Sequence, residues 1–322
     1  MIDNQETIPQ TQNEHISRAQ GCLIGQLAGD ALGSFVEFQS TEQIWRQHPD
    51  GIRDMVDGGT WHTIAGQPTD DSELALMLAR TLIEKGRFDR EAIREAYRFW
   101  YDSDPFDCGR TTYRGLMGDP DPVSESNGGM MRVSPLGIFG ANHDLKQVAD
   151  WARQDAAITH IHQVCQDTSA LFAMAIAYTI RTGCDANTLY EHIVSWAEEI
   201  TDEQSIVETI RAAKDTPPED YMHKMGYVLI ALQNALYQLL HAPNAEEGII
   251  DTVMRGGDTD TNAAICGALL GAVNGLSAMP ERWVETLRNC RPKEGTSGVY
   301  QPRPECFWPA DALELAVQLV EA

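Results

Sequence analysis

Apolar residues recur along this chain every three or four positions, which is the spacing of one face of an α-helix. Alternation of apolar and polar residues, which is typical of half-buried strands, is almost absent. The pattern predicts helices over residues 16–34, 71–85, 89–103, 144–157, 163–182, 186–200, 203–212, 225–241, 246–255, 260–275, 280–289 and 310–320. We therefore expect an all-α protein.

The breaks between these segments favour a single domain. They are short, and they carry the proline, glycine and aspartate that are typical of turns, as in DPDP at 119–122 and DTPPED at 215–220. None has the length and composition of a flexible linker. Residues 1–14 are polar and lack the helical periodicity, which favours a disordered tail. The sequence thus predicts a compact multi-helix domain over residues 15–322 behind that tail.

Two of the predicted helices carry glycine at every fourth position. The first has Gly21, Gly25, Gly29 and Gly33, and the second has Gly267, Gly271 and Gly275. Glycine costs about 1 kcal/mol relative to alanine at a helical position, so its repetition along one face indicates that another backbone comes very close there. We expect both helices to be central to the fold.

The overall charge restricts the ligands that the protein can bind. Among 322 residues, 48 are acidic and 24 are basic, which gives a formal net charge of −24. Without a basic cluster, nucleic acid is an unsuitable partner. An anionic metabolite would also be repelled unless positive groups or bound cations offset the charge.

Cysteine usage and hydropathy favour a cytoplasmic protein. The seven cysteines are scattered and include no CxxC pair, which is typical of reduced thiols rather than of disulfides or a thiol-based site. The first residues show no secretory leader, and no stretch is long and apolar enough to cross a membrane.

Two acidic clusters stand immediately before predicted helices, in PTDDSE and in RGGDTDTNAA. Each can be interpreted as a helix cap, and Asp70 followed by Glu73 has the spacing of a capping box. A cap needs only one acceptor, whereas each cluster supplies two carboxylates and at least one hydroxyl. Oxygen ligands of this kind suit hard cations such as Mg²⁺, Mn²⁺ or Ca²⁺.

A calcium-binding EF-hand loop does not account for the second cluster. Asp258, Asp260 and Asn262 fall at its first, third and fifth positions, but Ala263 and Leu269 occupy the positions that require glycine and glutamate. Two clusters at two helix starts indicate instead that the helices converge and that their carboxylates hold a pair of cations.

The order of several motifs resembles the ADP-ribosylglycohydrolase family, and in particular the dinitrogenase-reductase-activating glycohydrolases. The matching segments are GCLIGQLAGDALGSFVEF, PTDDSELALMLARTL, DPFDCGRTTYRG, NGGMMRVSPLGIF, ITHIH, MGYVLIALQNAL and RGGDTDTNAAICGALLGA. The resemblance covers about residues 16–290 and implies an all-α single domain with a binuclear Mg²⁺ or Mn²⁺ centre. It also implies hydrolysis of the glycosidic bond between ADP-ribose and a modified side chain or a small acceptor.

The resemblance assigns roles to individual residues of the acidic clusters. The implied ligands of two Mg²⁺ or Mn²⁺ ions are Thr69, Asp70, Asp71, Asp258, Asp260 and Thr261. Asp70, Asp71 and Asp258 are thereby implied in catalysis. Glu37 matches a glutamate near the metals that orients or deprotonates water, although it can also be an ordinary surface carboxylate.

Further residues are implied in substrate binding. Asp107 matches the carboxylate that faces a substrate guanidinium, with a turn residue as the alternative. Asn127, Gly128, Gly129 and Met130 resemble a loop whose backbone approaches the diphosphate and ribose, unless they form only a Gly-Gly turn. His160, ranked above His162, resembles a residue on the ribose side of the pocket, and Tyr227 resembles an aromatic that stacks on adenine. His160 and Tyr227 can equally be core residues.

The sequence leaves one alternative open for the acceptor of the ADP-ribose and another for the activity. Arg110 stands where the nitrogenase-regulating relatives carry asparagine, and a cation there can neutralise Asp107. The implied activity is hydrolysis of ADP-ribosylarginine in a protein, of the EC 3.2.2 type. The alternative is an immunity-type or ADP-ribose-binding protein that neutralises an ADP-ribosyltransferase toxin by binding, for which the polar residues before position 15 could serve.

Overall fold

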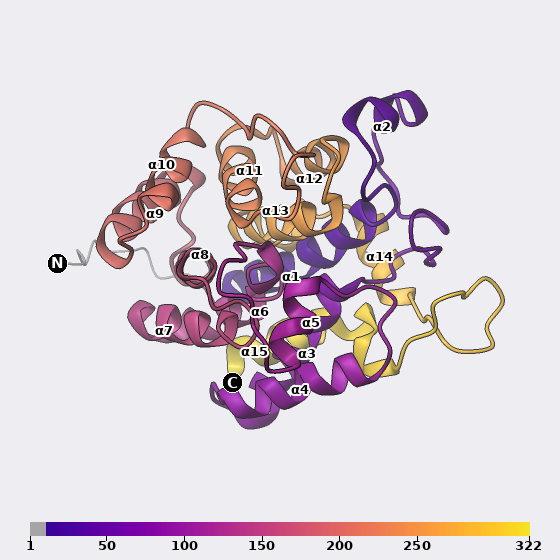
Figure 1. Ribbon diagram of the computed structural model, residues 1–322, viewed down its shortest axis with the longest axis horizontal. Coiled ribbons are helices and arrows are strands. Elements are labelled where there is room, and N and C mark those ends of the chain that lie inside the picture. The colour runs from indigo at the N-terminus through magenta and orange to yellow at the C-terminus, as the bar shows by residue number, and fades with distance from the viewer. Residues whose placement is uncertain (1–10) are drawn as a thin grey trace.

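The computed structural model describes residues 11–322, and this part of the chain forms fifteen α-helices and no β-strand, which confirms the predicted all-α class (Figure 1). The segments predicted from periodicity become α1 (Gln12–Gly33), α3 (Asp70–Lys85), α4 (Arg90–Asp102), α7 (Leu145–Ala156), α8 (Gln163–Thr182), α9 (Ala186–Ile200), α10 (Gln204–Ala212), α11 (Val228–His241), α12 (Ala245–Met254), α13 (Thr259–Asn274), α14 (Glu281–Asn289) and α15 (Ala312–Glu321). None of the described helices is long and apolar enough to cross a membrane.

Three short helices were not predicted. They are α2 (Thr41–Gln47), α5 (Arg110–Leu116) and α6 (Ser134–Phe139). Each has at most seven residues, which is too few for a helical repeat to be recognised. Single turns of 3₁₀ helix add η1 (Asn127–Gly129), η2 (Gly140–Asn142), η3 (Leu276–Ala278), η4 (Glu305–Phe307) and η5 (Pro309–Asp311).

The N-terminal boundary lies earlier than expected. The α1 helix begins at Gln12 because Thr11 and Glu14 form a capping box, so residues 12–14 of the predicted tail are helical. Residues 1–10 of that tail lie outside the described residues.

The glycine ladders bring α1 and α13 into direct backbone contact, and the two helices lie side by side at the centre of Figure 1. A Cβ atom on Gly25 would overlap the carbonyl oxygen of Gly267, and one on Gly29 would overlap that of Ala263. Gly33, at the last turn of α1, meets the backbone of Asp260 at the first turn of α13. The helices therefore run antiparallel, and the end of one lies beside the start of the other.

The α1 helix also positions two further segments through buried polar side chains. Asp30 is fully buried, and its carboxylate accepts hydrogen bonds from the backbone N–H groups of Thr69 (3.2 Å) and Ser72 (3.1 Å), at the start of α3. Gln26 donates through Nε2 to the carbonyl oxygen of Met131 (3.0 Å), in the loop before α6. Three elements are thus placed against one helix.

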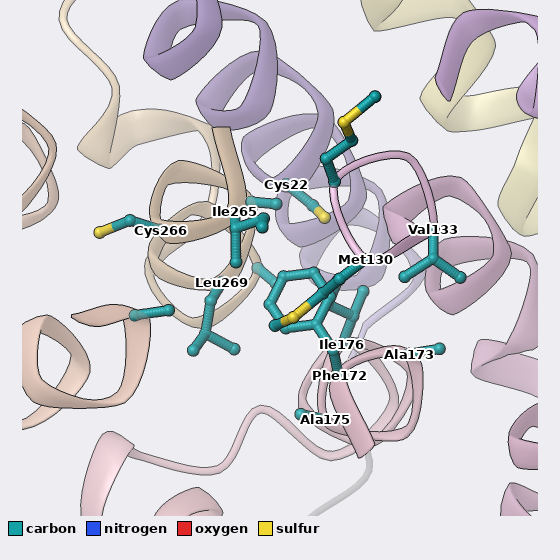
Figure 2. Packing of buried hydrophobic residues seen from close by; sticks show 14 of the residues in the cluster. Cys22, Met130, Val133, Phe172, Ala173, Ala175, Ile176, Ile265, Cys266 and Leu269 are labelled. Atoms are coloured by element: carbon teal, nitrogen blue, oxygen red, sulfur yellow. The ribbon is translucent and has the colours of Figure 1, made fainter. Parts of the chain in front are cut away.

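The apolar core surrounds this arrangement. Figure 2 shows Met130 and Val133, from the loop before α6, in the same buried cluster as Phe172 and Ile176 of α8 and Ile265 of α13. The α8 helix also packs along α7. These contacts fix the base of the loop that carries residues 127–131.

A buried ion pair attaches the C-terminal segment to α3. Arg303 donates through Nη2 to Glu73 Oε2 (2.8 Å), and Trp100 Nε1 donates to the same oxygen (2.7 Å). Arg303 Nη1 also donates to the carbonyl oxygens of Ser103 (2.9 Å) and Asp104 (3.2 Å). The segment after α14 thereby holds the loop after α4 against the first turn of α3.

We predict that Gly25→Ala destabilises the protein by roughly 1–3 kcal/mol, the usual cost of overpacking, although the same change would favour an isolated helix by about 1 kcal/mol. The physical reason is the overlap of the new methyl group with the Gly267 carbonyl. The measurement is the midpoint of urea unfolding.

The matched control is Gly109→Ala, whose methyl group would meet its nearest neighbour, Thr112 Oγ1, at an ordinary 3.7 Å. Equal stabilities of Gly25→Ala and the parent protein would contradict the close contact.

Candidate metal centre and substrate cavity

The two acidic clusters face one cavity of about 310 Å³ near the Gly33–Asp260 contact. Its acidic lining consists of Glu37, Asp70, Asp71, Asp107, Asp258 and Asp260. The other lining residues are Phe38, Gly109, Arg110, Thr111, Thr112, Ser126, Asn127, Gly128, Met131, His160, Met225, Gly226 and Thr261. The structure thus brings together clusters that are far apart in the sequence, as the pattern of the two helix starts indicated.

The clusters act as helix caps only in part, since the Thr261 N–H in the first turn of α13 donates to Asp260 Oδ1 (2.9 Å). Thr69 and Asp258 occupy the N-cap positions of α3 and α13, but neither side chain accepts a capping hydrogen bond. Glu73, the expected partner of a capping box, is paired with Arg303 instead. The backbone N–H groups at the start of α3 are satisfied by Asp30 from another helix, so the carboxylates of the cluster remain available to the cavity.

Two buried carboxylate oxygens lack any hydrogen-bond partner among the described residues. They are Asp71 Oδ1 and Asp260 Oδ2, one from each cluster. One oxygen from each of Glu37, Asp258 and Asp260 also lies within 4.8 Å of the other two, a spacing that can hold a metal ion. Unpartnered buried oxygens are costly, and a hard cation is the ligand that satisfies several at once.

The carboxylates of the cavity disfavour one another's ionisation. Burial raises the pKa of Asp71 well above its usual value, and the neighbouring Asp70 adds to this effect. Burial and the charge of Glu37 do the same to Asp260. Glu37 itself has its pKa raised to about 8, by burial and then by Asp258. A bound cation strongly stabilises the ionised form of a carboxyl group whose pKa is raised in this way.

The two threonines of the predicted ligand set differ in position. Thr261 lines the cavity. Thr69 is fully buried behind its wall, where Oγ1 donates to Asp30 Oδ1 (2.9 Å) and lies 3.2 Å from Asp71 Oδ2. Thr69 therefore contacts a carboxylate of its own cluster directly.

Glu37 is buried at the cavity edge rather than on the surface, with 6 % of its area exposed. Trp61 Nε1 donates to Glu37 Oε2 (2.6 Å), which leaves Oε1 for other partners. The next residue, Phe38, has a φ of 69° and is half exposed at the rim. The tight turn after α1 thus directs Glu37 inward and Phe38 outward.

Asp107 and Arg110 both line the cavity but are not paired with each other. Burial, followed by the charge of the neighbouring Asp70, raises the pKa of Asp107 to about 10. Arg110 is exposed at the start of α5, and no ion pair joins these two described residues within 4.0 Å. Neutralisation of Asp107 by Arg110 is therefore not a feature of the fold.

The Asn127–Gly129 turn lies beside the second acidic cluster. Asn127 Nδ2 donates to Asp258 Oδ2 (2.6 Å), and Gly128 lies so close to the imidazole ring of His160 that a Cβ atom would be 2.9 Å from Cε1. Gly129 packs against α7 at Ala156. Met130 points into the core, as Figure 2 shows, and its neighbour Met131 lines the cavity in its place.

The remaining predicted residues lie at different depths. His160 is buried and lines the cavity, whereas His162 caps α8 and accepts a hydrogen bond from Val164 N–H (3.3 Å). Tyr227 is the N-cap residue of α11, is half-buried, and does not line the cavity. The amine of Lys224 lies 5.7 Å from its ring centroid.

Several residues that shape the site were missed. Asp30 had a recognisable signal, because a charged residue within a glycine ladder is unlikely to be solvent-exposed. Trp61, Ser126, Thr111 and Arg303 gave none, because loop residues acquire their neighbours only through the tertiary fold.

Comparison with known proteins agrees with the geometry of the site. The sequence model of the family described as ADP-ribosylglycohydrolase matches residues 11–318. The ADP-ribosyl-[dinitrogen reductase] glycohydrolase of Rhodospirillum rubrum is 30% identical over 281 residues, covering 84% of this chain and 90% of that protein. The ADP-ribosylarginine hydrolase Tri1 of Pseudomonas putida (strain GB-1) is 28% identical over 307 residues, covering 86% of this chain and 76% of that protein.

A solved structure described as an ADP-ribosylglycohydrolase-related protein complex superimposes with a TM-score of 0.78 at 27% identity, covering 96% of this chain and 99% of that chain. Because the family model extends over nearly all of the described residues, and an all-α fold carries both acidic clusters to one cavity, the match concerns the whole domain. The chain belongs to the ADP-ribosylglycohydrolase family.

Proposed function

We propose that this protein hydrolyses the N-glycosidic bond that joins ADP-ribose to an arginine side chain of a modified protein, with the help of two divalent cations. The observation that carries the proposal is the convergence of the two acidic clusters on one cavity, with an unpartnered carboxylate oxygen in each. The name of the relative from Pseudomonas putida supports arginine as the acceptor, and the name of the relative from Rhodospirillum rubrum supports an ADP-ribosylated protein as the substrate.

The residues present fit Mg²⁺ or Mn²⁺. Carboxylate and hydroxyl oxygens are hard ligands, and no thiol or imidazole belongs to either cluster. The residues that would hold the cations are Thr69, Asp70, Asp71, Asp258, Asp260 and Thr261. When bound, divalent cations would supply positive charge to ribose and phosphate oxygens and lower the pKa of a water molecule.

Glu37 is the residue that we assign to the attacking water. Its Oε2 is fixed by Trp61, so Oε1 can orient a water molecule and take a proton from it. The water oxygen forms a bond to the anomeric carbon, the bond from that carbon to the guanidine nitrogen breaks, and the proton passes to the leaving guanidine. The products are ADP-ribose and unmodified arginine.

Asp107 is the residue that we assign to the leaving group. It lines the cavity beside Asp70, and both carboxyl groups are poorly solvated there. A guanidinium offers planar N–H donors and a positive charge, which complement a carboxylate in geometry and in sign. An acceptor without a positive charge, such as serine, would be bound less strongly by Asp107.

The test is release of free ADP-ribose from substrates modified on arginine, on serine and on other acceptors, with and without Mg²⁺. The proposal expects cation-dependent turnover with preference for the arginine linkage. Stoichiometric inhibition of an ADP-ribosyltransferase without any turnover would refute it and favour the immunity-type alternative.

We predict that Asp70→Ala and Asp258→Ala each abolish hydrolysis while the helical content stays unchanged. Each substitution removes a cation ligand, and each also relieves repulsion between buried carboxylates. Without added cations, the variants should therefore be at least as stable as the parent protein. The measurements are initial rate, circular dichroism and thermal unfolding with and without Mg²⁺.

The control is Asp202→Ala, at an exposed position outside the cavity. It should keep both turnover and the stabilisation by Mg²⁺. Normal turnover of either cluster variant near physiological Mg²⁺ would count decisively against the proposed centre.

We predict that Asp107→Asn lowers kcat/KM for ADP-ribosylarginine by about one to two decades, which corresponds to the loss of a charge-assisted contact of roughly 1.5–3 kcal/mol. Hydrolysis of ADP-ribosylserine should change much less. Kinetics on both linkages, at fixed pH and Mg²⁺ concentration, measure the difference.

Arg110→Asn serves as the companion variant. Because Arg110 is exposed and does not pair with Asp107, its substitution should leave the preference for the arginine linkage unchanged. If Asp107→Asn reduces kcat/KM equally for both linkages, Asp107 does not recognise the guanidinium.

A further inference from the structure

A chain of hydrogen bonds runs from a buried ion pair to the cavity wall. Arg132 is fully buried and donates through Nε to Asp155 Oδ2 (3.2 Å) and through Nη1 to Thr159 Oγ1 (2.9 Å). Thr159 Oγ1 lies 2.7 Å from His160 Nδ1. His160 Nε2 lies 3.0 Å from Ser126 Oγ, and Ser126 lines the cavity.

The direction of this chain is fixed at its buried end. An arginine guanidinium only donates, so Thr159 Oγ1 must accept from Arg132. Thr159 is fully buried, and its hydroxyl has no other hydrogen-bond partner than Arg132 and His160 among residues 11–322. If it did not donate to His160 Nδ1, its proton would be buried without an acceptor, which is costly. Thr159 therefore donates to Nδ1.

The same reasoning determines which imidazole nitrogen of His160 carries the proton. Because Nδ1 of His160 accepts, the single ring proton of the neutral imidazole resides on Nε2. Burial, followed by the positive charge of Arg132, lowers the pKa of His160 to about 3, so the ring is neutral at physiological pH. Nε2–H then donates to Ser126 Oγ.

The second lone pair of Ser126 is also engaged. Ser124 Oγ donates to Ser126 Oγ at 3.3 Å, and Thr111 Oγ1 lies 2.7 Å from Ser124 Oγ. With both lone pairs occupied, the hydroxyl proton of Ser126 is left to point into the cavity that it lines.

We propose that Ser126 is a hydrogen-bond donor of fixed direction, set by Arg132, Thr159 and His160, for an oxygen of the ligand that can only accept. Phosphate oxygens have this property. The inference rests on the proposed function for its ligand, the diphosphate of ADP-ribose. Ser126 belongs to the binding surface, whereas Thr159 and His160 are positioning residues.

The composition of the cavity explains why such a donor matters. Six carboxyl groups line it, and one N–H of the nearby Asn127 amide is already donated to Asp258. A diphosphate needs donors on the side of the cavity away from the carboxylates. A serine whose proton could rotate toward the imidazole would present lone pairs to the phosphate and repel it.

The first test determines the tautomer of His160 in the full chain. Long-range ¹H–¹⁵N correlation spectra of ¹⁵N-histidine-labelled protein distinguish Nδ1–H from Nε2–H, and a His160→Gln sample assigns the signal. We expect the neutral Nε2–H form without any ligand. The Nδ1–H form would reverse the chain and overturn the proposal.

The second test is a double-mutant cycle on ADP-ribose affinity, measured by calorimetry. Ser126→Ala should weaken binding about tenfold or more, because the lost hydrogen bond has a charged acceptor. Thr159→Val, a substitution outside the cavity, frees the imidazole to exchange tautomers and should weaken binding several-fold. In the Ser126→Ala background, Thr159→Val should have no further effect.

Thr159→Ser keeps the hydroxyl and is the matched control, with tautomer and affinity expected to stay as in the parent protein. If Thr159→Val weakens ADP-ribose binding equally in the parent protein and in the Ser126→Ala background, its role is merely structural and the proposal is overturned. Unchanged affinity in Ser126→Ala would also overturn it. Absence of any ADP-ribose binding by the parent protein would overturn the proposed function, while the tautomer still decides the direction of the chain.

Discussion

The backbone contact between α1 and α13 is the constraint on which the rest of the structure depends. Only glycine permits it, since a single methyl group at Gly25 or Gly29 would overlap a carbonyl oxygen of the partner helix. The contact places the last turn of α1 beside the first turn of α13. One carboxylate oxygen of Glu37, which follows α1, therefore lies within 4.8 Å of one of Asp260. Asp30 and Gln26 of the same helix then place the start of α3 and the loop before α6.

This rigid arrangement holds groups that repel one another. Burial and neighbouring charge raise the pKa values of the carboxyl groups at Glu37, Asp71 and Asp260, which means that folding without cations concentrates unfavourable charge. Contacts from outside the clusters hold them in place, notably Trp61 on Glu37 and Asn127 on Asp258. The fold thus provides the stability that the site itself lacks, as preorganised sites require.

The sequence predicted what depends on local pattern and missed what depends on distant partners. The long helices and the glycine contact follow from spacing alone, but α2, α5 and α6 are too short to show a helical repeat. The acidic clusters were recognisable because two carboxylates exceed what a helix cap needs, whereas the Glu73–Arg303 pair joins residues that no pattern connects. Which of Met130 and Met131 faces the core also follows from no pattern, since the backbone turn after Gly129 decides it.

The two sides of the cavity differ in what they offer to a ligand. One side presents carboxylates from α3, α13 and the end of α1, and it favours cations and a guanidinium. The rest of the lining includes the Asn127–Gly129 turn, which contacts Asp258, and hydroxyl neighbours that offer O–H donors. ADP-ribosylarginine has the complementary polarity, with a cationic acceptor at one end and a diphosphate at the other. For an acidic protein of net charge −24, donors set apart from the carboxylates would favour one orientation of the proposed anionic substrate.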